Sequence, residues 1–376
     1  MNLLSDSVYW LAAALTVVAL VGAAWVVAHL PRGTWRWLLN VPVVALASAL
    51  IALSAGLVLN RQNAWYTSWG DLFGTATGSA NVVVVGEHKA SSVFQHDHRI
   101  VTTDFRALPP LPSPGSRVQK YMIPTSVGHN TWEVQVILPQ DYEAPGNLAR
   151  AYPVLMAAHG APGSPSSYLD RGRMPISKLT DPSVAQHRVA PFITVIPALL
   201  PGGMDNECVF GPGGADQLET WLSVDVPKFI KAHLRVIQER TGWAWLGYSA
   251  GGWCAAMETI LHPGTFAAAA VLSGYFTPWW GAPPPFTANS PQDQRLNLGA
   301  EVQRTRPRIA LWVQSSKPDT ESYPSTKLFL SHVRPPTLVQ AVIDSTGGHR
   351  FPSWTQHVPQ IMIWLGQNVP GFAPNA

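Results

Sequence analysis

Residues 243–260 read WAWLGYSAGGWCAAMETI, and three parts stand out in them. The first part is an apolar run typical of a buried strand, and the last is an alanine-rich run typical of a helix. Between them stands G-Y-S-A-G, a G-x-S-x-G pattern. The bare pattern is common, but a strand before it and a helix after it are what a nucleophile elbow requires. We therefore predict that Ser249 is a nucleophile at the apex of a sharp turn, the alternative being a simple Gly/Ser turn that opens a helix.

On both sides of this segment, from Arg117 onward, short apolar runs alternate with helical stretches. Strands that are apolar throughout and separated by helices indicate a mostly parallel sheet with helices on both faces. The sequence therefore predicts an α/β fold. The predicted strands span residues 131–138, 154–158, 193–196, 244–246, 268–272, 309–313 and 339–343, and the predicted helices span 218–236, 251–261, 325–333 and 353–365.

A serine needs a base to become a strong nucleophile, and the chain has 12 histidines. His349 stands in IDSTGGHRFPSW, after the last predicted strand and before the last predicted helix, where a loop histidine can reach back over the sheet. We predict His349 as the base. The acid that orients the imidazole is expected in QSSKPDTESYPS, after the strand at 309–313. Asp319, in a Pro-Asp turn, is the preferred acid, and Glu321 is the alternative.

An oxyanion hole needs two backbone N–H groups close to the nucleophile. One is expected from Ala250, the residue after the nucleophile. The other is expected from Ala161, in the H-G-A turn after the strand at 154–158, where Gly160 makes room. This H-G pair could also simply end the strand. The predicted site contains no metal and no cofactor.

Only 12% of the residues are charged, about half the roughly 25% of a typical soluble protein. Two runs, 8–30 and 37–59, carry no Lys, Arg, Asp or Glu, and each is 23 residues long. A helix of this length can cross a hydrocarbon core of about 30 Å. We predict two transmembrane helices within residues 1–60, the alternative being a buried helical hairpin. A cleaved signal peptide fits poorly, because Asp6 precedes the first run without any Lys or Arg.

The connection between the two runs, PRGTWRW, carries Arg32 and Arg36. The positive-inside rule places this connection in the cytoplasm, and therefore both chain ends and the α/β domain outside the cytoplasmic membrane. Arg61 is a small contrary signal. Residues 61–116 are predicted to be a linker or a wrapped arm with one short strand, VVVVG, and the α/β domain is expected over 117–376.

Composition excludes several classes of protein. With 25 Lys and Arg against 22 Asp and Glu, the net charge is +3 and no basic block appears, so a nucleic-acid partner is not expected. Two cysteines exclude a disulfide scaffold and a cysteine-rich metal site. Cys208 and Cys254 could form one disulfide in the outer domain, where such bonds persist, or could be two separate buried thiols.

The residues from about Tyr121 to Gln367 resemble the α/β-hydrolase esterases grouped with S-formylglutathione hydrolase, enterochelin esterase and the actinobacterial mycolyltransferases. The matching pieces are the H-G loop, GYSAGGWCAA, GGHRFPSW and the stretches at 205–230 and 262–276. The resemblance implies an α/β-hydrolase fold after the two-helix hairpin. It also implies hydrolysis or transfer of an acyl group by a serine, an acid and a histidine, with Ser249 as nucleophile and His349 as base.

The chain departs from the mycolyltransferases at two points. Their acid is a glutamate on the helix after the late strand, whereas the predicted helix 325–333 has no acidic residue. They are also secreted, without a two-helix anchor. We therefore expect a membrane-anchored serine esterase whose substrate is an acyl-ester small molecule, lipid or glycolipid. The alternatives are an acyltransferase to an envelope sugar or lipid, and a non-catalytic binding protein on the same fold.

Overall fold

A computed structural model of the chain describes residues 2–29, 36–76, 78–97, 108–128, 130–203, 205–210, 217–280, 283–284 and 286–374. The chain divides into two units. The smaller unit holds Met1–Ser79, Ser316–Glu321 and Ser345–Arg350, and the larger holds Ala80–Ser315, Ser322–Asp344 and Phe351–Ala376. Arg32, on which the predicted orientation in the membrane partly rests, lies outside the described residues.

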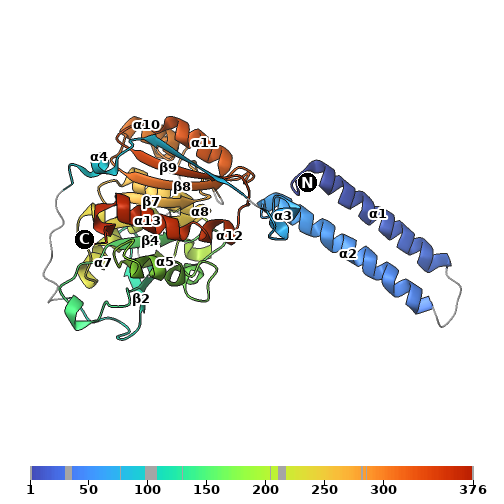
Figure 1. The fold of residues 1–376 in the computed structure, drawn as a ribbon, viewed down its shortest axis with the longest axis horizontal. Helices are drawn as coiled ribbons and strands as arrows, with labels where there is room; N and C mark the ends of the chain where they lie inside the picture. Colours follow the sequence, from blue (N-terminus) through green and yellow to red (C-terminus); the bar gives the residue numbers. More distant parts are fainter. Residues whose placement is uncertain are drawn as a thin grey trace. The chain divides into compact units, whose positions relative to one another are not determined.

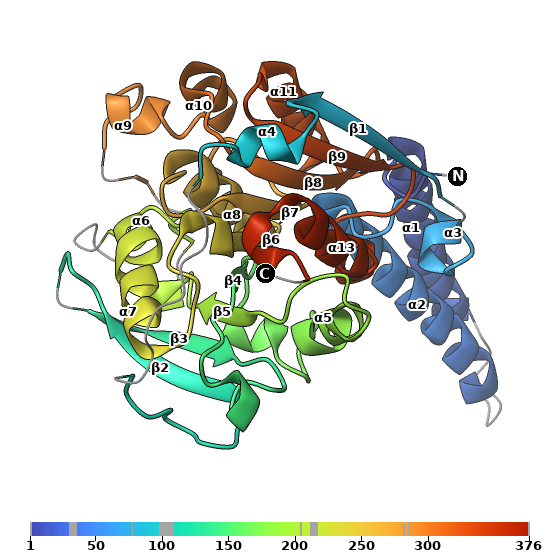
Figure 2. The same ribbon diagram turned by 60° about the vertical axis from the view of Figure 1, so that its left-hand side comes forward.

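A nine-stranded sheet forms the centre of the larger unit, in the order β1-β9-β8-β7-β6-β4-β5-β3-β2 (Figures 1 and 2). Strands β5, β4, β6, β7 and β8 are parallel neighbours, whereas β1, β2 and β3 pair antiparallel at the edges. The mostly parallel sheet predicted from the apolar strands is therefore confirmed. The strands are β1 (Ala80–Gly86), β2 (Val118–Pro124), β3 (Thr131–Ile137), β4 (Val154–Ala158), β5 (Ile193–Pro197), β6 (Trp243–Tyr248), β7 (Ala268–Leu272), β8 (Ala310–Ser316) and β9 (Leu338–Asp344).

Helices cover both faces of this sheet (Figure 2). Residues of α5 and α13 share an apolar cluster with one face, and residues of α7, α8 and α10 share a cluster with the other. The described helices of the larger unit are α4 (Ala90–Phe94), α5 (Ile176–Ala185), α6 (Leu218–Thr220), α7 (Val226–His233), α8 (Ala250–Leu261), α9 (Pro291–Gln294), α10 (Leu298–Thr305), α11 (Tyr323–His332), α12 (Phe351–Thr355) and α13 (Val358–Asn368).

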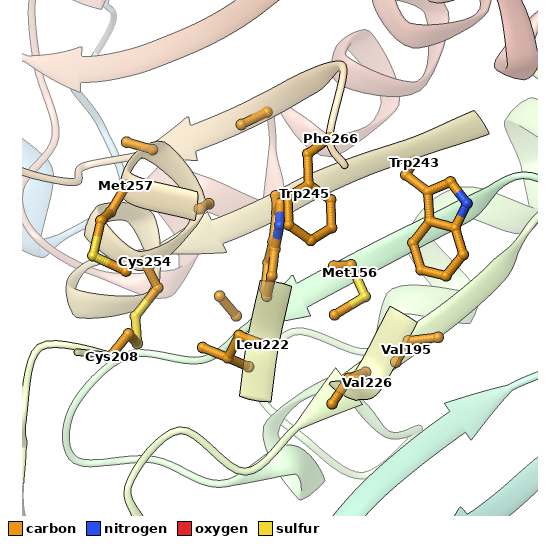
Figure 3. Close-up of a cluster of buried hydrophobic side chains, with 14 of the residues drawn as sticks. Met156, Val195, Cys208, Leu222, Val226, Trp243, Trp245, Cys254, Met257 and Phe266 are labelled. Atoms are coloured by element: carbon orange, nitrogen blue, oxygen red, sulfur yellow. A yellow bond between two sulfur atoms is a disulfide. The ribbon is translucent and has the colours of Figure 1, made fainter. Parts of the chain in front are cut away.

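Side chains of the central strands alternate between these two clusters. Trp243 and Trp245 of β6 pack in one, while Ala244 and Leu246 pack in the other. Figure 3 shows the tryptophan side of the sheet, where the ring centroid of Trp245 lies 5.4 Å from that of Phe266. Since a strand shifted by one residue would exchange its two faces, this packing fixes the register of β6 and the place where it ends.

Two predicted helices are each divided in the structure. The helix predicted over 218–236 consists of α6, a π-helical turn at Trp221–Asp225, and α7. The helix predicted over 353–365 consists of α12 and α13. Both α7 and α13 begin next to a proline, Pro227 and Pro359. Proline has no N–H and is favoured in the first turn of a helix, where both prolines stand.

The edges of the sheet differ from the prediction as well. Strand β1 pairs with β9, so part of the segment predicted as a linker or wrapped arm belongs to the sheet. Strand β2 was not predicted, because a buried glutamine and two exposed apolar residues interrupt the alternation of apolar and polar residues. Gln119 is fully buried while Val118 and Met122 are exposed. The Gln119 amide compensates for its burial by donating to the Ser113 and Ser116 carbonyls.

In the smaller unit, α1 (Asp6–His29) and α2 (Arg36–Asn63) form a helical hairpin (Figure 1). The Thr16 hydroxyl of α1 lies 2.8 Å from the Ser54 hydroxyl of α2 and joins the two helices. Asp6–His29 and Asn40–Asn63 are long and apolar enough to cross a membrane, with mean hydropathies of 2.4 and 2.3. Their large apolar side chains are mostly exposed, including Trp10 and Trp25. The short helix α3 (Trp69–Leu72) follows α2.

Candidate active site

Ser249 occupies the turn between β6 and α8, as the sequence predicted. Its backbone has φ 57° and ψ −128°, a conformation that is costly for a residue with a side chain. The Ser249 N–H donates to the Leu272 carbonyl at 2.9 Å, and its carbonyl accepts from the Gly252 N–H at 2.8 Å. These bonds hold the strained turn at the carboxyl end of β6 and at the N-terminus of α8.

The two glycines of the motif are required by close contacts. A Cβ on Gly247 would collide with the carbonyl group of Gly251, and one on Gly251 would collide with the Ala158 carbonyl at the end of β4. The strand, the turn and the helix can therefore approach one another only with glycine at both positions. The pattern G-x-S-x-G is a steric requirement of this turn.

The proposed oxyanion residues lie beside this turn. Ala250 is the first residue of α8, and the first N–H groups of a helix have no acceptor within it. On the other side, a Cβ placed on Gly160 would lie 3.1 Å from the Cβ of Ser249, so the H-G loop runs next to the nucleophile. Ala161 follows in this loop. The structure thus brings the predicted nucleophile and both predicted donor residues into one region of the larger unit.

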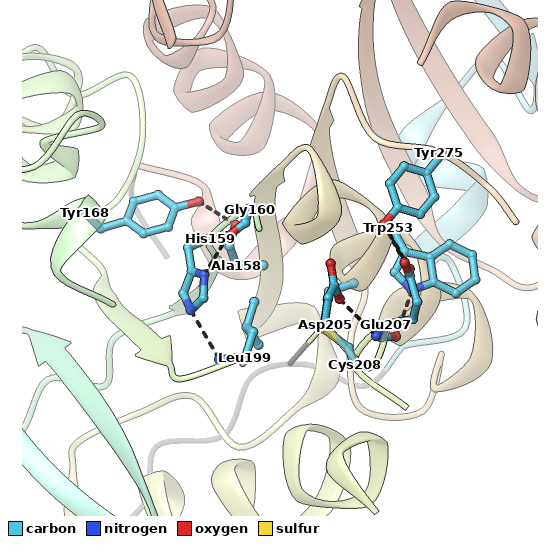
Figure 4. Close-up of a disulfide and its surroundings, with 11 residues drawn as sticks. Ala158, His159, Gly160, Tyr168, Leu199, Asp205, Glu207, Cys208, Trp253 and Tyr275 are labelled. Atoms are coloured by element: carbon cyan, nitrogen blue, oxygen red, sulfur yellow. Dashed lines mark hydrogen bonds between the residues drawn. A yellow bond between two sulfur atoms is a disulfide. The ribbon is translucent and has the colours of Figure 1, made fainter. Parts of the chain in front are cut away.

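His159 holds the H-G loop, a role that the sequence did not reveal. Its Nδ1 lies 3.0 Å from the Gly160 carbonyl, and its Nε2 lies 3.2 Å from the Leu199 N–H (Figure 4). Burial lowers the pKa of His159, an effect that the bond to Gly160 opposes. A neutral imidazole suits both bonds, because Nδ1–H donates to the carbonyl while Nε2 accepts from the amide.

The predicted base and both candidate acids lie together in the smaller unit. His349 Nδ1 is 3.0 Å from Asp319 Oδ2, and Asp319 is fully buried. Glu321 is instead near the other ring nitrogen, with Oε2 3.6 Å from His349 Nε2. Asp319 therefore occupies the position from which an acid orients the ring, and Glu321 occupies the side where Nε2 would meet a substrate or a serine.

Further hydrogen bonds join the loops that carry these three residues. The Ser316 hydroxyl donates to the Gly347 carbonyl at 2.8 Å, which ties the acid loop to the histidine loop. The Asp319 N–H donates to the Ser316 carbonyl at 2.9 Å. The Glu321 N–H donates to Asp319 Oδ1 at 3.1 Å, so one carboxylate oxygen is held by the backbone while the other faces the imidazole.

Burial and neighbouring charges shift the pKa values of both His349 and Glu321. Burial lowers the pKa of His349, but the hydrogen bond and the negative charge of Asp319, with Glu321 adding to them, outweigh it and raise the pKa above its usual value. Burial and the charge of Asp319 raise the pKa of Glu321, and the charge of His349 opposes them. A protonated imidazole ring at His349 is therefore stabilised by the neighbouring Asp319 and Glu321.

Residues 126–365 match the model of the Esterase family. The chain belongs to this family. The family is one of esterases, enzymes that act on ester bonds. An uncharacterized protein of Corynebacterium glutamicum is 29% identical over 136 residues, which make up 36% of this chain and 31% of that protein. The match thus covers less than a third of the relative's length.

Solved structures show that this esterase has the α/β-hydrolase fold. A ferulic acid esterase superposes with a TM-score of 0.55 at 18% identity, covering 69% of this chain and 100% of that one. S-formylglutathione hydrolase from Agrobacterium tumefaciens gives 0.54 at 14% identity, with 67% and 95% covered. Mycobacterium tuberculosis MPT51 gives 0.50 at 14% identity, with 68% and 99% covered.

The esterase carries a disulfide between Cys208 and Cys254, whose Cα atoms lie 5.8 Å apart. Cys254 belongs to α8, five residues after the candidate nucleophile, and Figure 4 shows the surroundings of the bond. The neighbouring Trp253 donates from its indole N–H to the Glu207 carbonyl at 2.8 Å. Burial, with the charge of Asp205, raises the pKa of Glu207 to about 8. The helix that begins at the elbow is thus fastened to residues 205–208.

Reducing the disulfide is expected to lower the free energy of unfolding of this esterase by about 2–4 kcal/mol, because the bond constrains the unfolded chain across a separation of 46 residues. Urea unfolding with and without a phosphine reductant measures the change. A Cys208→Ser, Cys254→Ser double variant is the control, and its unfolding should not respond to reductant. Equal midpoints for the oxidised and the fully reduced wild type would contradict the expectation.

The kcat/KM of the esterase is expected to fall as pH decreases through the raised pKa of His349, because a protonated Nε2 cannot accept a proton. Glu321→Gln removes a negative charge beside Nε2 and should move this acid limb to lower pH. A pH–rate profile between about pH 5 and 9 tests this. Glu143→Gln removes an exposed carboxylate elsewhere and should leave the profile in place. A limb that moves to higher pH in Glu321→Gln would refute the argument.

Proposed function

We propose that this protein is a membrane-anchored serine esterase that works outside the cytoplasmic membrane, with Ser249, His349 and Asp319 as its catalytic triad. The bond between Asp319 and His349 Nδ1 carries the proposal. A buried carboxylate on this nitrogen fixes the tautomer in which Nε2 can accept the proton of a serine.

The topology of the sheet supports the inclusion of Ser249. Strands β6, β7 and β8 are parallel, so their carboxyl ends lie at one edge of the sheet. Ser249 directly follows β6, and Asp319 follows β8 by three residues. Active sites of α/β folds form at this edge, and the order serine, acid, histidine along the chain is that of α/β-hydrolases.

The reaction then proceeds in two steps. Ser249 Oγ attacks the ester carbonyl while His349 takes the proton of the Ser249 hydroxyl. The negative charge that develops on the carbonyl oxygen is stabilised by the Ala250 and Ala161 N–H groups. When the tetrahedral intermediate collapses, the bond between the acyl carbon and the oxygen of the leaving alcohol breaks, and His349 gives its proton to that alcohol oxygen. The product is an acyl-enzyme on Ser249.

The acceptor in the second step determines whether the acyl group is hydrolysed or transferred. Water, deprotonated by His349, attacks the acyl carbon. The bond between that carbon and Ser249 Oγ then breaks, His349 returns the proton to Oγ, and the carboxylic acid is released. A sugar hydroxyl in the same place would give a new ester, which is the acyltransferase alternative. The two reactions share every residue of the triad and differ only in the nucleophile that reaches the acyl carbon.

Exposed apolar side chains on α1 and α2 support the membrane anchor. Trp10, Val18 and Trp25 of α1 are more than half exposed, and lipid stabilises such a surface where water does not. Arg32 and Arg36, in the sequence PRGTWRW, favour a cytoplasmic location for the connection between the two apolar runs, and residues 61–376 would then lie outside. A reporter enzyme fused to the C-terminus and active only outside the cytoplasm would support this orientation, and activity only inside would overturn it.

Product analysis tests the catalytic proposal. The full chain in detergent micelles or vesicles is incubated with acyl esters of short and long chains, with and without a disaccharide acceptor. We expect release of the free acid. Formation of an acylated sugar would instead favour the acyltransferase alternative. Absence of any turnover, together with absence of covalent labelling by a fluorophosphonate, would refute both and favour a binding role on this fold.

A further inference from the structure

Residues 64–73, which directly follow α2, form a segment that we call the juxtamembrane segment; it contains α3. It packs against residues 345–350, the histidine loop, which carries the candidate base. Both belong to the smaller unit together with the helical hairpin. The two stretches are almost 280 residues apart in the sequence, so their contact is a feature of the folded chain alone.

Backbone contacts join the two stretches at His349 itself. The His349 N–H donates to the Ala64 carbonyl at 3.0 Å. Ala64 is fully buried and has φ 48°, an unfavourable value for a residue with a Cβ. At the preceding position, a Cβ on Gly348 would collide with the carbonyl oxygens of Ala64 and Trp65. The approach is so close that only glycine fits before the histidine.

An ion pair also holds the histidine loop at Arg350, the residue after His349. The Arg350 guanidinium donates to Asp71 Oδ1, and the Asp71 residue is only 6% exposed. The other oxygen of Asp71 accepts from the Thr67 N–H at 3.0 Å. The Arg350 guanidinium also lies over the ring of Tyr66, 4.7 Å from its centroid. A partly buried, hydrogen-bonded pair of this kind restricts both partners far more than an exposed one.

The juxtamembrane segment is in turn held by the end of α2 and by the residues before α1. The Asn60 side chain of α2 accepts from the Tyr66 N–H at 2.7 Å and donates to the Tyr66 carbonyl at 2.8 Å. From the start of the chain, the Leu3 N–H donates to the Thr67 carbonyl at 3.0 Å. A set of hydrogen bonds thus leads from the end of α2 through the juxtamembrane segment to His349 and Arg350.

We propose that the juxtamembrane segment positions His349, with Asp71 and Arg350 as positioning residues, so that catalysis depends on the folded anchor. The proposal rests on the role of His349 as base in the proposed function. Asp71 and Arg350 bond to each other, and Asp71 also bonds to the backbone of the juxtamembrane segment. They act by holding Nε2, since displacing a reacting group by about 1 Å can lower a rate about a hundredfold.

Asp71→Asn in the full chain tests the proposal. It removes the charge that holds Arg350 and keeps the size of the side chain. We expect kcat for each active site to fall about tenfold to a hundredfold, with KM changed by less than about threefold. Active sites are counted by the end point of fluorophosphonate labelling, so misfolded molecules do not enter the rate. Arg350→Lys keeps the charge and should retain more activity than Arg350→Gln.

Asp181→Asn is the matched control. It removes the carboxylate of a partly buried pair with Arg117, which belongs to the larger unit. Its kcat for each active site should be unchanged. If Asp71→Asn lowers only the number of active sites, as Asp181→Asn could, the segment is merely structural and the proposal is wrong. If His349→Ala keeps full activity, the proposed function itself fails, which is a different result from a failure of the positioning role.

Discussion

Replacing Ser249 with alanine is expected to lower kcat on acyl esters by a factor on the order of 10⁴ to 10⁶, and to abolish labelling by a fluorophosphonate. The reason is that Oγ is the atom that attacks and that carries the acyl group. Backbone donors and substrate binding remain, so a small activity above that of water is expected to persist. Initial rates and mass spectrometry of the labelled protein measure the two effects.

Ser273 provides a matched control for this variant. It directly follows β7, is 1% exposed and also has a positive φ, of 44°, but it is not part of a G-x-S-x-G turn. Ser273→Ala should retain activity within a few-fold of wild type and should still be labelled. Loss of labelling in Ser273→Ala with retention in Ser249→Ala would show that the nucleophile was assigned to the wrong turn.

The second large effect is expected at the acid. Asp319→Asn should lower kcat by about 10⁴-fold, because an amide at Nδ1 no longer stabilises the imidazolium and favours the wrong tautomer. Glu321→Gln should cost far less, since Glu321 faces Nε2 and does not orient the ring. Steady-state kinetics of the two variants decide between the two carboxyl groups. A larger loss in Glu321→Gln than in Asp319→Asn would make Glu321 the acid.

Asp344→Asn is the control for removal of a buried Asp–His contact as such. Asp344 Oδ2 lies 2.8 Å from His357 Nε2 and also accepts from the Gln314 amide at 2.8 Å. This pair lies at the end of β9 and the start of α13. Loss of the contact between Asp344 and His357 should lower the melting temperature of the protein without lowering kcat for each active site. A comparable loss of kcat in Asp344→Asn would mean that the effect at Asp319 reflects stability.

The candidate site could be predicted from the sequence where the signal is local. Ser249 was found because an apolar strand, a glycine-flanked serine and a helix follow one another within eighteen residues. Asp319 was preferred over Glu321 only for its Pro-Asp turn, since both residues follow the same strand. The structure distinguishes their positions by the ring nitrogen that each approaches. That difference depends on the turn of a loop, which composition and periodicity do not encode.

The parts that the sequence did not predict depend on partners far along the chain. His159 is one of twelve histidines, and its function comes from Leu199, forty residues away. Asp71 and Arg350 stand in segments without periodicity, and their pairing follows from the fold alone.

In the sheet, the apolar central strands were predicted because both of their faces are buried. Strand β2 was not, because its buried glutamine conceals the alternation.

Strand β1 has a consequence for work with shortened chains. It pairs with β9 along seven residues and is itself the edge of the sheet. A chain that begins at residue 117, where the α/β domain was predicted to start, would leave the backbone N–H and C=O groups of β9 unpaired on that side. Unprotected strand edges of this kind pair with other molecules and promote aggregation. A soluble form of the enzyme should therefore begin before Ala80.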